Sequence, residues 1–306
     1  MTNSDQSVLD KKNIDTILVL DFGSQYTQLI ARRIRELDVF SIILPWDISK
    51  ERILEINPTG IILSGGPESV TNKNTPRIPE IIFDLDIPIL GICYGMQTLA
   101  EQFGGQVTAS STKEFGHASI TLEQASILFD GFDAGSLVDV WMSHGDHVSS
   151  LPDQFLLIAS TPSAPIAAMA HSKKPIYALQ FHPEVTHTKE GSAVLENFVF
   201  KICNCQAQWK MGNLIEQRIL DIKERVGDHK VLLGLSGGVD SSVTAMLLDR
   251  AIGKNLICMF VDNGLLRKNE AEEVEDLFRE KMDLNLLVVD AKKIFHRHLK
   301  GISDPE

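Results

Sequence analysis

The sequence predicts an α/β protein of two domains, each with a largely parallel sheet at its centre. Short continuous apolar runs, typical of strands covered on both faces, alternate with longer segments of helical periodicity. Glycine, serine, aspartate and cysteine follow these runs, at the carboxyl ends of strands where open α/β sheets bind their ligands. The 306 residues exceed one ordinary domain and suffice for two cores.

The overall composition limits what the protein can bind. A formal net charge of −12 argues against a surface for nucleic acid. The polar N-terminus lacks the apolar segment of a signal peptide, and no run of about 18 apolar residues occurs. The four cysteines, Cys93, Cys203, Cys205 and Cys258, are too scattered for a disulfide framework, and Cys203 with Cys205 lacks the second pair of a zinc site. We therefore expect a cytoplasmic protein that binds neither nucleic acid nor a membrane.

The first domain is expected to span residues 14–205, after a flexible N-terminus of residues 1–13. Its predicted strands are 16–21, 60–63, 88–92, 138–142, 155–160, 166–170 and 176–181, and its predicted helices are 25–37, 94–103 and 190–204. The arginines of the first helix, Arg32, Arg33 and Arg35, are interpreted as a solvated face.

The second domain is expected to span residues 206–306. Its predicted helices are 206–227, 238–252 and 268–281, and its predicted strands are 231–235, 256–261 and 284–289. Three strands are few for a nucleotide-binding sheet, and we therefore expect the chain to be part of a longer protein.

Cys93 is the first candidate for chemistry, because it lies between a predicted strand and a predicted helix with Gly91 and Gly95 around it. The spacing Gly-x-Cys-x-Gly is typical of a nucleophile elbow, in which small residues let the chain bend sharply and expose the nucleophile. The start of a helix also favours a thiolate over a thiol. The alternative is a buried, inert cysteine at the end of a strand.

A cysteine nucleophile needs a base, and His182 with Glu184 can supply the base and its orienting group. If both lie on a strand, positions i and i+2 face the same side, so Glu184 can hydrogen-bond the imidazole that approaches Cys93. A surface pair is the alternative for an isolated His-x-Glu.

An oxyanion formed at an amide carbon needs two donors. The backbone N–H of Tyr94, the residue after the nucleophile, is one candidate. The Ser64-Gly65-Gly66 loop, after another strand, can offer the N–H of Gly66 as the second, and such a donor contributes about 3–4 kcal/mol to catalysis.

Four motifs together resemble the class I glutamine amidotransferases, whose domain has a flavodoxin-like mixed sheet. They are Gly91-Ile-Cys-Tyr-Gly-Met-Gln97, Ser64-Gly-Gly-Pro67, Met142-Ser-His-Gly-Asp146 and Gln180-Phe-His-Pro-Glu184. The resemblance implies glutamine hydrolysis through a thioester on Cys93, with release of ammonia. It also implies that Gln97 and the loop Ser143-His144-Gly145 hold the glutamine, and it gives the base role to His182 rather than to His144.

A second constellation lies between a strand and a helix of the second domain. Ser236, Gly237, Gly238, Val239, Asp240, Ser241 and Ser242 place backbone N–H groups and three hydroxyls at a helix N-terminus, which predicts an anion site. The segment lacks the Gly-Lys-[Ser/Thr] of a Walker A loop. It resembles the PP-loop of N-type ATP pyrophosphatases, and the incomplete domain is accordingly expected to have a Rossmann-like parallel sheet. The resemblance places ATP at this loop and adenine near Val261, and Asp262 is a further candidate neighbour of the nucleotide.

The order of the two domains resembles that of the glutamine-hydrolysing GMP synthases. This resemblance implies that ATP, with Mg²⁺, adenylates XMP, and that ammonia from glutamine then displaces AMP to give GMP. It also implies a homodimer, formed through a C-terminal domain beyond residue 306 that holds XMP. Two other functions stay open from the residues: a stand-alone glutaminase or cysteine hydrolase, and a regulatory fragment without activity.

Overall fold

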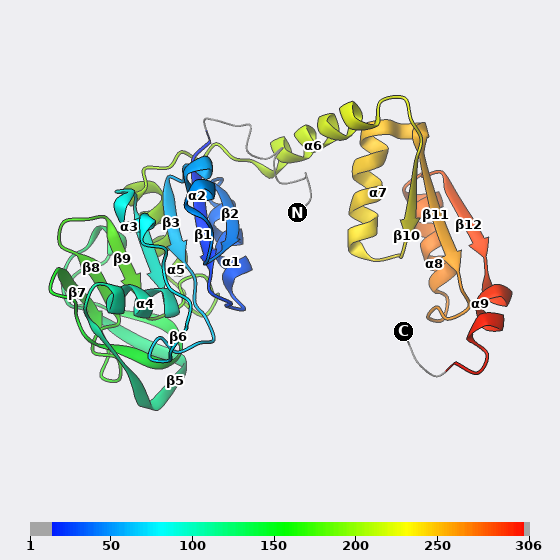
Figure 1. Ribbon diagram of the computed structural model, residues 1–306. Coiled ribbons are helices and arrows are strands. Elements are labelled where there is room, and N and C mark those ends of the chain that lie inside the picture. Colours follow the sequence, from blue (N-terminus) through cyan, green and yellow to red (C-terminus); the bar gives the residue numbers. More distant parts are fainter. Residues whose placement is uncertain (1–13, 303–306) are drawn as a thin grey trace. The chain divides into compact units, whose positions relative to one another are not determined.

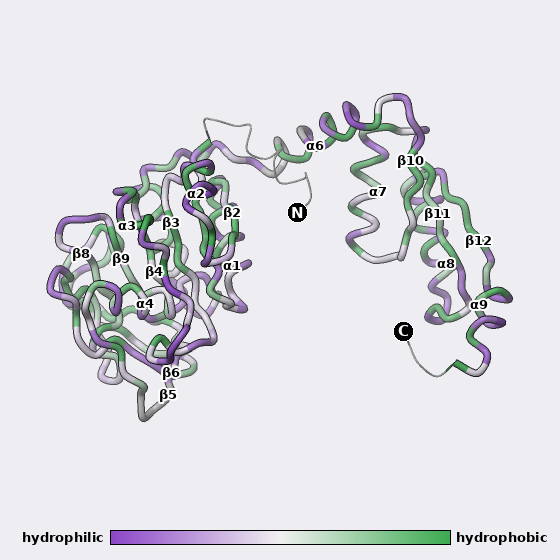
Figure 2. The backbone as a smooth tube through the Cα atoms, in the orientation of Figure 1, coloured by the Kyte–Doolittle hydropathy of each residue, from purple (hydrophilic) through white to green (hydrophobic). Residues whose placement is uncertain are grey.

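The computed structural model describes residues 14–302, and the chain divides into two compact units (Figure 1). The first unit extends to Lys210 and the second begins at Met211. In both, apolar residues run along the strands, whereas polar residues are frequent in the connecting loops (Figure 2). None of the helices in the described part of the chain has the length and hydropathy needed to cross a bilayer.

The first unit is built on one nine-stranded mixed sheet, with the order β2-β1-β3-β4-β9-β8-β7-β5-β6. The strands are β1 (Thr16–Asp21), β2 (Phe40–Pro45), β3 (Gly60–Leu63), β4 (Ile89–Ile92), β5 (Gln106–Leu122), β6 (Leu137–Ser150), β7 (Phe155–Ser160), β8 (Ala168–His171) and β9 (Ile176–Leu179). The pairs from β2 through β9 are parallel, and the remaining pairs are antiparallel. The predicted flavodoxin-like mixed sheet is confirmed.

Helices cover both faces of the parallel part of this sheet. The helices are α1 (Thr27–Glu36), α2 (Lys50–Ile56), α3 (Ile81–Asp84), α4 (Tyr94–Gln102) and α5 (Gly191–Glu196), and α5 continues as a π-helical stretch over Asn197–Ile202. Ile17 and Val19 of β1 pack with α1 and α5, whereas Leu18 and Leu20 pack with α2 and α4. Successive residues of a strand point to opposite faces, and both faces of β1 are therefore buried.

Two parts of this unit differ from the sequence prediction. The strand Phe40–Pro45 was not predicted, and it forms the edge of the sheet beside β1. The predicted strand 138–142 is the N-terminal part of the longer β6, which continues to Ser150 and pairs with β5 along most of its length. Pairing with β5 satisfies the backbone of the polar residues after Met142, so their low hydropathy does not end the strand.

The arginines of α1 are not all solvated, and that interpretation is wrong for two of them. Arg32 is exposed and pairs with Glu36. Arg33 donates from Nε to the carbonyl oxygen of Glu184 at 3.0 Å, and Arg35 donates to the carbonyl oxygen of Ser41 at 2.8 Å. These two side chains therefore join α1 to other segments of the unit.

The second unit has a three-stranded parallel sheet of order β10-β11-β12, as predicted. Its strands are β10 (Val231–Leu235), β11 (Leu256–Asp262) and β12 (Leu286–Asp290), and its helices are α6 (Met211–Val226), α7 (Val239–Ile252), α8 (Glu270–Glu275) and α9 (Lys292–Leu299). The helix α8 continues as a π-helical stretch over Asp276–Lys281.

Only one face of the second sheet is covered in the described chain. Leu256, Cys258 and Phe260 of β11 pack with residues of α7 and α8. The opposite face carries apolar residues that stay exposed, such as Leu232 at 60% and Leu287 at 48%. A parallel sheet usually has both faces buried, and this one does not.

Candidate active site

The structure places Cys93 at a sharp turn between β4 and α4. Its backbone has φ 53° and ψ −104°, a conformation that residues with a Cβ rarely adopt and that marks a strained position. The two glycines are required by close contacts: a Cβ on Gly91 would lie 2.8 Å from the carbonyl oxygen of Gly95, and one on Gly95 would lie 2.4 Å from that of Leu63. The geometry is that of a nucleophile elbow.

His182 and Glu184 come together after β9. His182 Nδ1 and Glu184 Oε1 are 2.7 Å apart, and the two side chains are almost completely buried. The argument that placed them on a strand is wrong, because β9 ends at Leu179 and both residues lie in the turn that follows it. The turn, and not strand alternation, brings the carboxylate to the imidazole.

Neighbouring segments fix this turn in place. The backbone N–H of His182 donates to the carbonyl oxygen of Trp141 at 3.1 Å, and the Thr188 hydroxyl donates to the carbonyl oxygen of His182 at 2.7 Å. On the other side, Gly191 at the start of α5 lies so close that a Cβ there would be 2.0 Å from the carbonyl oxygen of Pro183. Strand β6 and helix α5 therefore hold the His182 turn between them.

Burial and neighbouring charge shift the pKa of His182 in opposite directions. Burial lowers the pKa of His182, but the charge of Glu184 and hydrogen bonds to Cys93 and Glu184 outweigh it and raise that pKa from 6.5 to about 10. Within residues 14–302, the second carboxylate oxygen of Glu184 is buried without a hydrogen-bond partner. The imidazolium is therefore the main partner of a carboxylate that cannot reach water.

The predicted oxyanion donors lie at adjoining loops. The Ser64 hydroxyl accepts from the backbone N–H of Phe22 at 3.0 Å, and the Ser64 carbonyl oxygen accepts from that of Gly95 at 3.1 Å, so the loop after β3 is joined to the elbow. Among the described residues, the N–H groups of Gly66 and Tyr94 have no hydrogen-bond partner. Both remain available to a ligand.

The residues predicted to hold glutamine lie in two different settings. Ser143, His144 and Gly145 belong to strand β6 and not to a loop, which corrects that prediction. The carbonyl oxygen of Ser143 is 3.5 Å from Cys93 Sγ, whereas His144 is buried and its Nε2 lies 3.2 Å from Glu114 Oε2. Burial lowers the pKa of His144, and the charge of Glu114 opposes this.

Gln97 and Gln180 form a buried pair next to the elbow. Gln97 Nε2 donates to the carbonyl oxygen of Asp146 at 2.7 Å and lies 3.5 Å from Gln180 Oε1. Gln180 Nε2 in turn lies 3.8 Å from Cys93 Sγ. Sequence reasoning assigned no role to the Gln180 side chain, although its position two residues before His182 was a usable signal.

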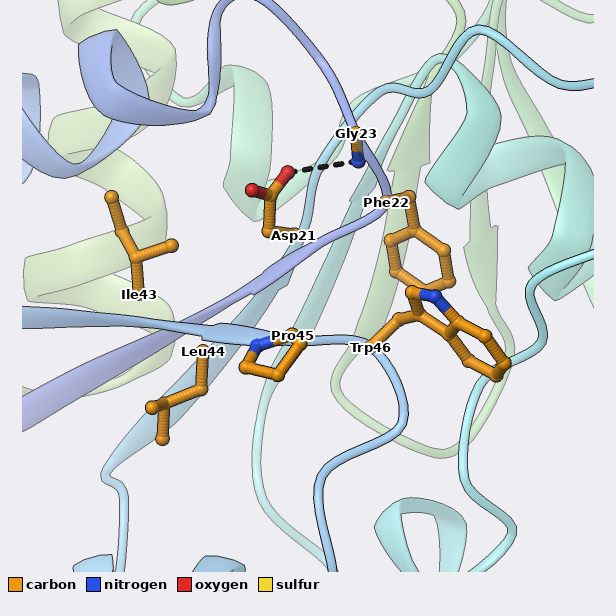
Figure 3. Close-up of a pocket in the computed structure, with 7 residues that line it drawn as sticks. All are labelled: Asp21, Phe22, Gly23, Ile43, Leu44, Pro45 and Trp46. Atoms are coloured by element: carbon orange, nitrogen blue, oxygen red, sulfur yellow. Dashed lines mark hydrogen bonds between the residues drawn. The ribbon is translucent and has the colours of Figure 1, made fainter. Parts of the chain in front are cut away.

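A pocket of about 410 Å³ opens at the carboxyl ends of β1 and β2 (Figure 3). It is lined by Asp21, Phe22, Gly23, Ile43, Leu44, Pro45 and Trp46. None of the predicted glutamine-binding residues lines it. Phe22 connects it with the elbow, because its ring packs against that of Tyr94 at a centroid distance of 5.5 Å.

The predicted anion loop of the second unit lies between β10 and α7. Its hydroxyls gather as expected, but they bond within the loop: Ser241 Oγ and Ser242 Oγ donate to the carbonyl oxygen of Gly238 at 2.9 and 2.8 Å, and Ser236 Oγ lies 3.3 Å from Ser241 Oγ. Ser236, Gly237, Gly238, Val239 and Asp240 are exposed. The loop is thus an open turn at a helix N-terminus.

The two residues predicted near the nucleotide differ in their surroundings. Val261 is 37% exposed, on the uncovered face of the sheet. Asp262 Oδ2 is 2.9 Å from Lys292 Nζ, and its Oδ1 accepts from the backbone N–H of Gly264 at 2.9 Å. These hydrogen bonds lower the pKa of Asp262. In the described chain, no three His, Cys, Asp or Glu side chains form a group that could hold a metal ion.

The sequence matches two protein families. Residues 18–202 match the family described as glutamine amidotransferase class-I, and residues 213–305 match the family described as NAD synthase. The elbow, the buried His–Glu pair and the mixed sheet lie within the first match. The chain belongs to the class I glutamine amidotransferase family.

Its curated relatives include glutamine-hydrolysing GMP synthases. That of Pasteurella multocida is 57% identical over 295 residues, which cover 95% of this chain and 56% of the relative. That of Alteromonas mediterranea is 56% identical over 296 residues, with the same coverage of both chains. The chain thus spans slightly more than half the length of these relatives.

Solved structures resemble the first unit. A Thermoplasma acidophilum protein, provisionally described as one of the subunits of a GMP synthase, is 35% identical, with a TM-score of 0.56, covering 63% of this chain and 95% of that one. A glutamine amidotransferase from Thermotoga maritima is 19% identical, with a TM-score of 0.52, covering 62% of this chain and 99% of that one. The second likeness concerns the fold alone.

Proposed function

We propose that the first unit hydrolyses glutamine, with Cys93 as nucleophile, His182 as base and Glu184 as orienting group. The observation that carries this proposal is the buried pair of His182 and Glu184, with 2.7 Å between Nδ1 and Oε1, whose imidazole also interacts with Cys93. A protonated His182 beside a Cys93 thiolate is the starting state that a cysteine amidase needs.

The reaction follows from these positions. The Cys93 thiolate adds to the amide carbon of glutamine, and the N–H groups of Gly66 and Tyr94 bind the oxyanion. His182 gives its proton to the departing nitrogen and the C–N bond breaks. Ammonia is released, and the glutamyl group stays bound to Cys93 as a thioester. His182 then takes a proton from water, which attacks the thioester, and glutamate is released while the thiolate re-forms.

Substrate binding is assigned to the residues around the elbow. Because Gln97 Nε2 already donates to Asp146, its Oε1 is the atom that can accept from the glutamine ammonium. The β6 segment Ser143, His144 and Gly145 contributes its backbone, since the Ser143 carbonyl oxygen already lies near Cys93 and the His144 side chain is turned to Glu114.

The second unit is proposed to bind ATP, so that the full-length protein converts XMP, ATP and glutamine to GMP. Its support is the open loop from Ser236 to Ser242, together with the similarity to GMP synthases along 95% of the chain. Adenine is placed near Val261. In this proposal the XMP oxygen attacks the α-phosphorus of ATP and pyrophosphate leaves, and ammonia from the first unit then displaces AMP from the adenylated XMP.

Magnesium, localisation and assembly belong to the same proposal. A Mg²⁺ ion on a nucleotide needs only one or two protein carboxylates, and Asp240, exposed in the first turn of α7, fits that requirement. The ion would neutralise phosphate charge. We further propose a cytoplasmic homodimer that binds no nucleic acid and no membrane.

One pair of assays tests the proposal against its alternatives. Glutamate release and XMP-dependent pyrophosphate release are measured on this chain and on a full-length protein. We expect both from the full-length protein, and slow glutamate release without GMP from this chain. Glutamate release without any XMP-dependent pyrophosphate in the longer protein would support a stand-alone glutaminase, and loss of both activities would support a regulatory fragment.

A further inference from the structure

Gln180 lies beside the reacting sulfur, and the proposed mechanism gives it no task. Its side chain is completely buried, with Nε2 at 3.8 Å from Cys93 Sγ and Oε1 at 3.5 Å from Gln97 Nε2. A buried amide without partners would cost stability, so each of its groups is expected to be used.

The chain itself fixes the direction of these hydrogen bonds. The backbone carbonyl of Asp146 can only accept, so the atom of Gln97 that lies 2.7 Å from it must be the NH₂ group. That NH₂ group then faces an acceptor on Gln180, namely Oε1. The remaining end of Gln180 is its own NH₂ group, which points at Cys93 Sγ as a donor.

Two groups near the sulfur act in opposite directions. The Ser143 carbonyl oxygen, 3.5 Å from Cys93 Sγ, suits a thiol that donates and repels a thiolate. Gln180 Nε2 suits a thiolate that accepts. Among the described residues, His182 is the titratable group that faces Cys93, with Glu184 behind it.

We propose that Gln180 is a positioning residue for glutamine hydrolysis: it donates to the Cys93 thiolate and holds the Gln97 amide with its oxygen toward the substrate. The proposal rests on the proposed function, because it assigns a task within that site. The hydrogen bonds run from the Asp146 carbonyl through the amides of Gln97 and Gln180 to the Cys93 sulfur. This chain of hydrogen bonds explains why two neutral amides are buried next to the nucleophile.

The test measures the thiolate directly and needs no glutamine. Alkylation of the Cys93 peptide by iodoacetamide is followed by mass spectrometry from pH 5 to 9.5 in the wild-type chain, Gln180→Met and Gln180→Leu. We expect Gln180→Met to shift the midpoint upward by about one pH unit, with a rate about tenfold lower below the midpoint. Gln180→Leu, which also removes the donor without adding a charge, should shift the midpoint by a similar amount.

Gln102→Met is the matched control. Gln102 also uses both ends of its amide, with Ile78 of the same unit, but it has no contact with Cys93. Its alkylation profile should equal that of the wild type. An unshifted midpoint in Gln180→Met, or equal shifts in Gln180→Met and Gln102→Met, would overturn the proposal.

Two further measurements separate the possible failures. Thermal unfolding shows whether Gln180→Met is folded, and if it is not, Gln180→Leu, which is close to glutamine in volume and has no donor, decides the question alone: a wild-type midpoint in that variant overturns the proposal. Glutamine kinetics on Gln180→Met should show a raised KM as well as a lowered kcat, because Gln97 loses its alignment. Absence of glutamine hydrolysis in the wild type would count against the proposed function and leave the alkylation result valid.

Discussion

The two units of this chain build their candidate sites in different ways. The site of the first unit joins the loops after β3 and β4, helix α4, strand β6 and the turn after β9, on a sheet that is covered on both faces. The predicted anion site of the second unit is one continuous loop, at the end of a sheet with one face exposed. A distributed site depends on the packing that brings its parts together, whereas a loop site depends mainly on its local sequence.

The largest expected effect separates the chemistry of the two units. Cys93→Ala should lower glutamate release at least a thousandfold, because no other group replaces the nucleophile. Binding of ATP to the second unit, measured by calorimetry, should stay unchanged. In a full-length protein, the proposed GMP synthesis should persist when ammonium salt replaces glutamine. Equal loss of glutamine-dependent and ammonia-dependent synthesis would contradict the separation.

The buried pair of His182 and Glu184 in the first unit should make the free energy of unfolding depend on pH. The pKa of His182 is raised from 6.5 to about 10, so its contribution is complete below pH 6.5 and is lost as the pH rises through 10. We expect up to about 4 kcal/mol of the free energy of unfolding to disappear across this range. Glu184→Gln, measured by denaturant unfolding at the same pH values, should show a flatter curve, and parallel curves would refute the assignment.

Glu184→Gln should reduce glutamine turnover about 30- to 100-fold, less than His182→Ala, because an orienting group is less essential than the base. Steady-state kinetics at pH 8 measures both variants. A harmless His182→Ala would remove the base role from His182 and make His144 the next candidate.

Pairs of adjacent residues compare the two sheets. Leu18→Ala and Val19→Ala, on opposite faces of β1, should each lower the free energy of unfolding by about 2–4 kcal/mol, because both side chains are buried. In β12, Leu286→Ala should cost about 2–3 kcal/mol and Leu287→Ala less than about 1 kcal/mol, since the first is 5% and the second 48% exposed. Similar values for Leu286→Ala and Leu287→Ala would show that the outer face of the second sheet is covered in solution.

The smallest effect concerns α1. Arg33→Ala should lower the free energy of unfolding by about 1 kcal/mol, because Arg33 anchors the carbonyl oxygen of Glu184. Arg32→Ala should change it by less than about 0.5 kcal/mol, since Arg32 makes only an exposed pair with Glu36. Thermal melts of the two variants give the comparison, and equal values would mean that the Glu184 contact adds nothing.

The sequence predicted the features that depend on neighbouring residues and missed those that depend on tertiary packing. The elbow at Cys93 and the loop after β10 are contiguous motifs, and the structure has both between a strand and a helix. The supports of the first site were not predicted, because the contacts of Arg33 and Thr188 with the His182 turn depend on tertiary packing. The strand Phe40–Pro45 and the length of β6 were missed for a similar reason, since pairing with a neighbour and not hydropathy defines them.

The contact between Gly191 and the Pro183 carbonyl has a consequence for how this chain can vary. Gly191 has no side chain that could take part in the reaction, and it belongs to none of the motifs identified in the sequence. Yet any side chain there would press on the backbone between His182 and Glu184, because a Cβ would lie 2.0 Å from that oxygen. In a library of all single substitutions selected for growth on glutamine, position 191 should tolerate as few replacements as position 93. A map of the positions that tolerate few substitutions would thus mark the residues packed against the His182 turn as clearly as the reacting groups themselves.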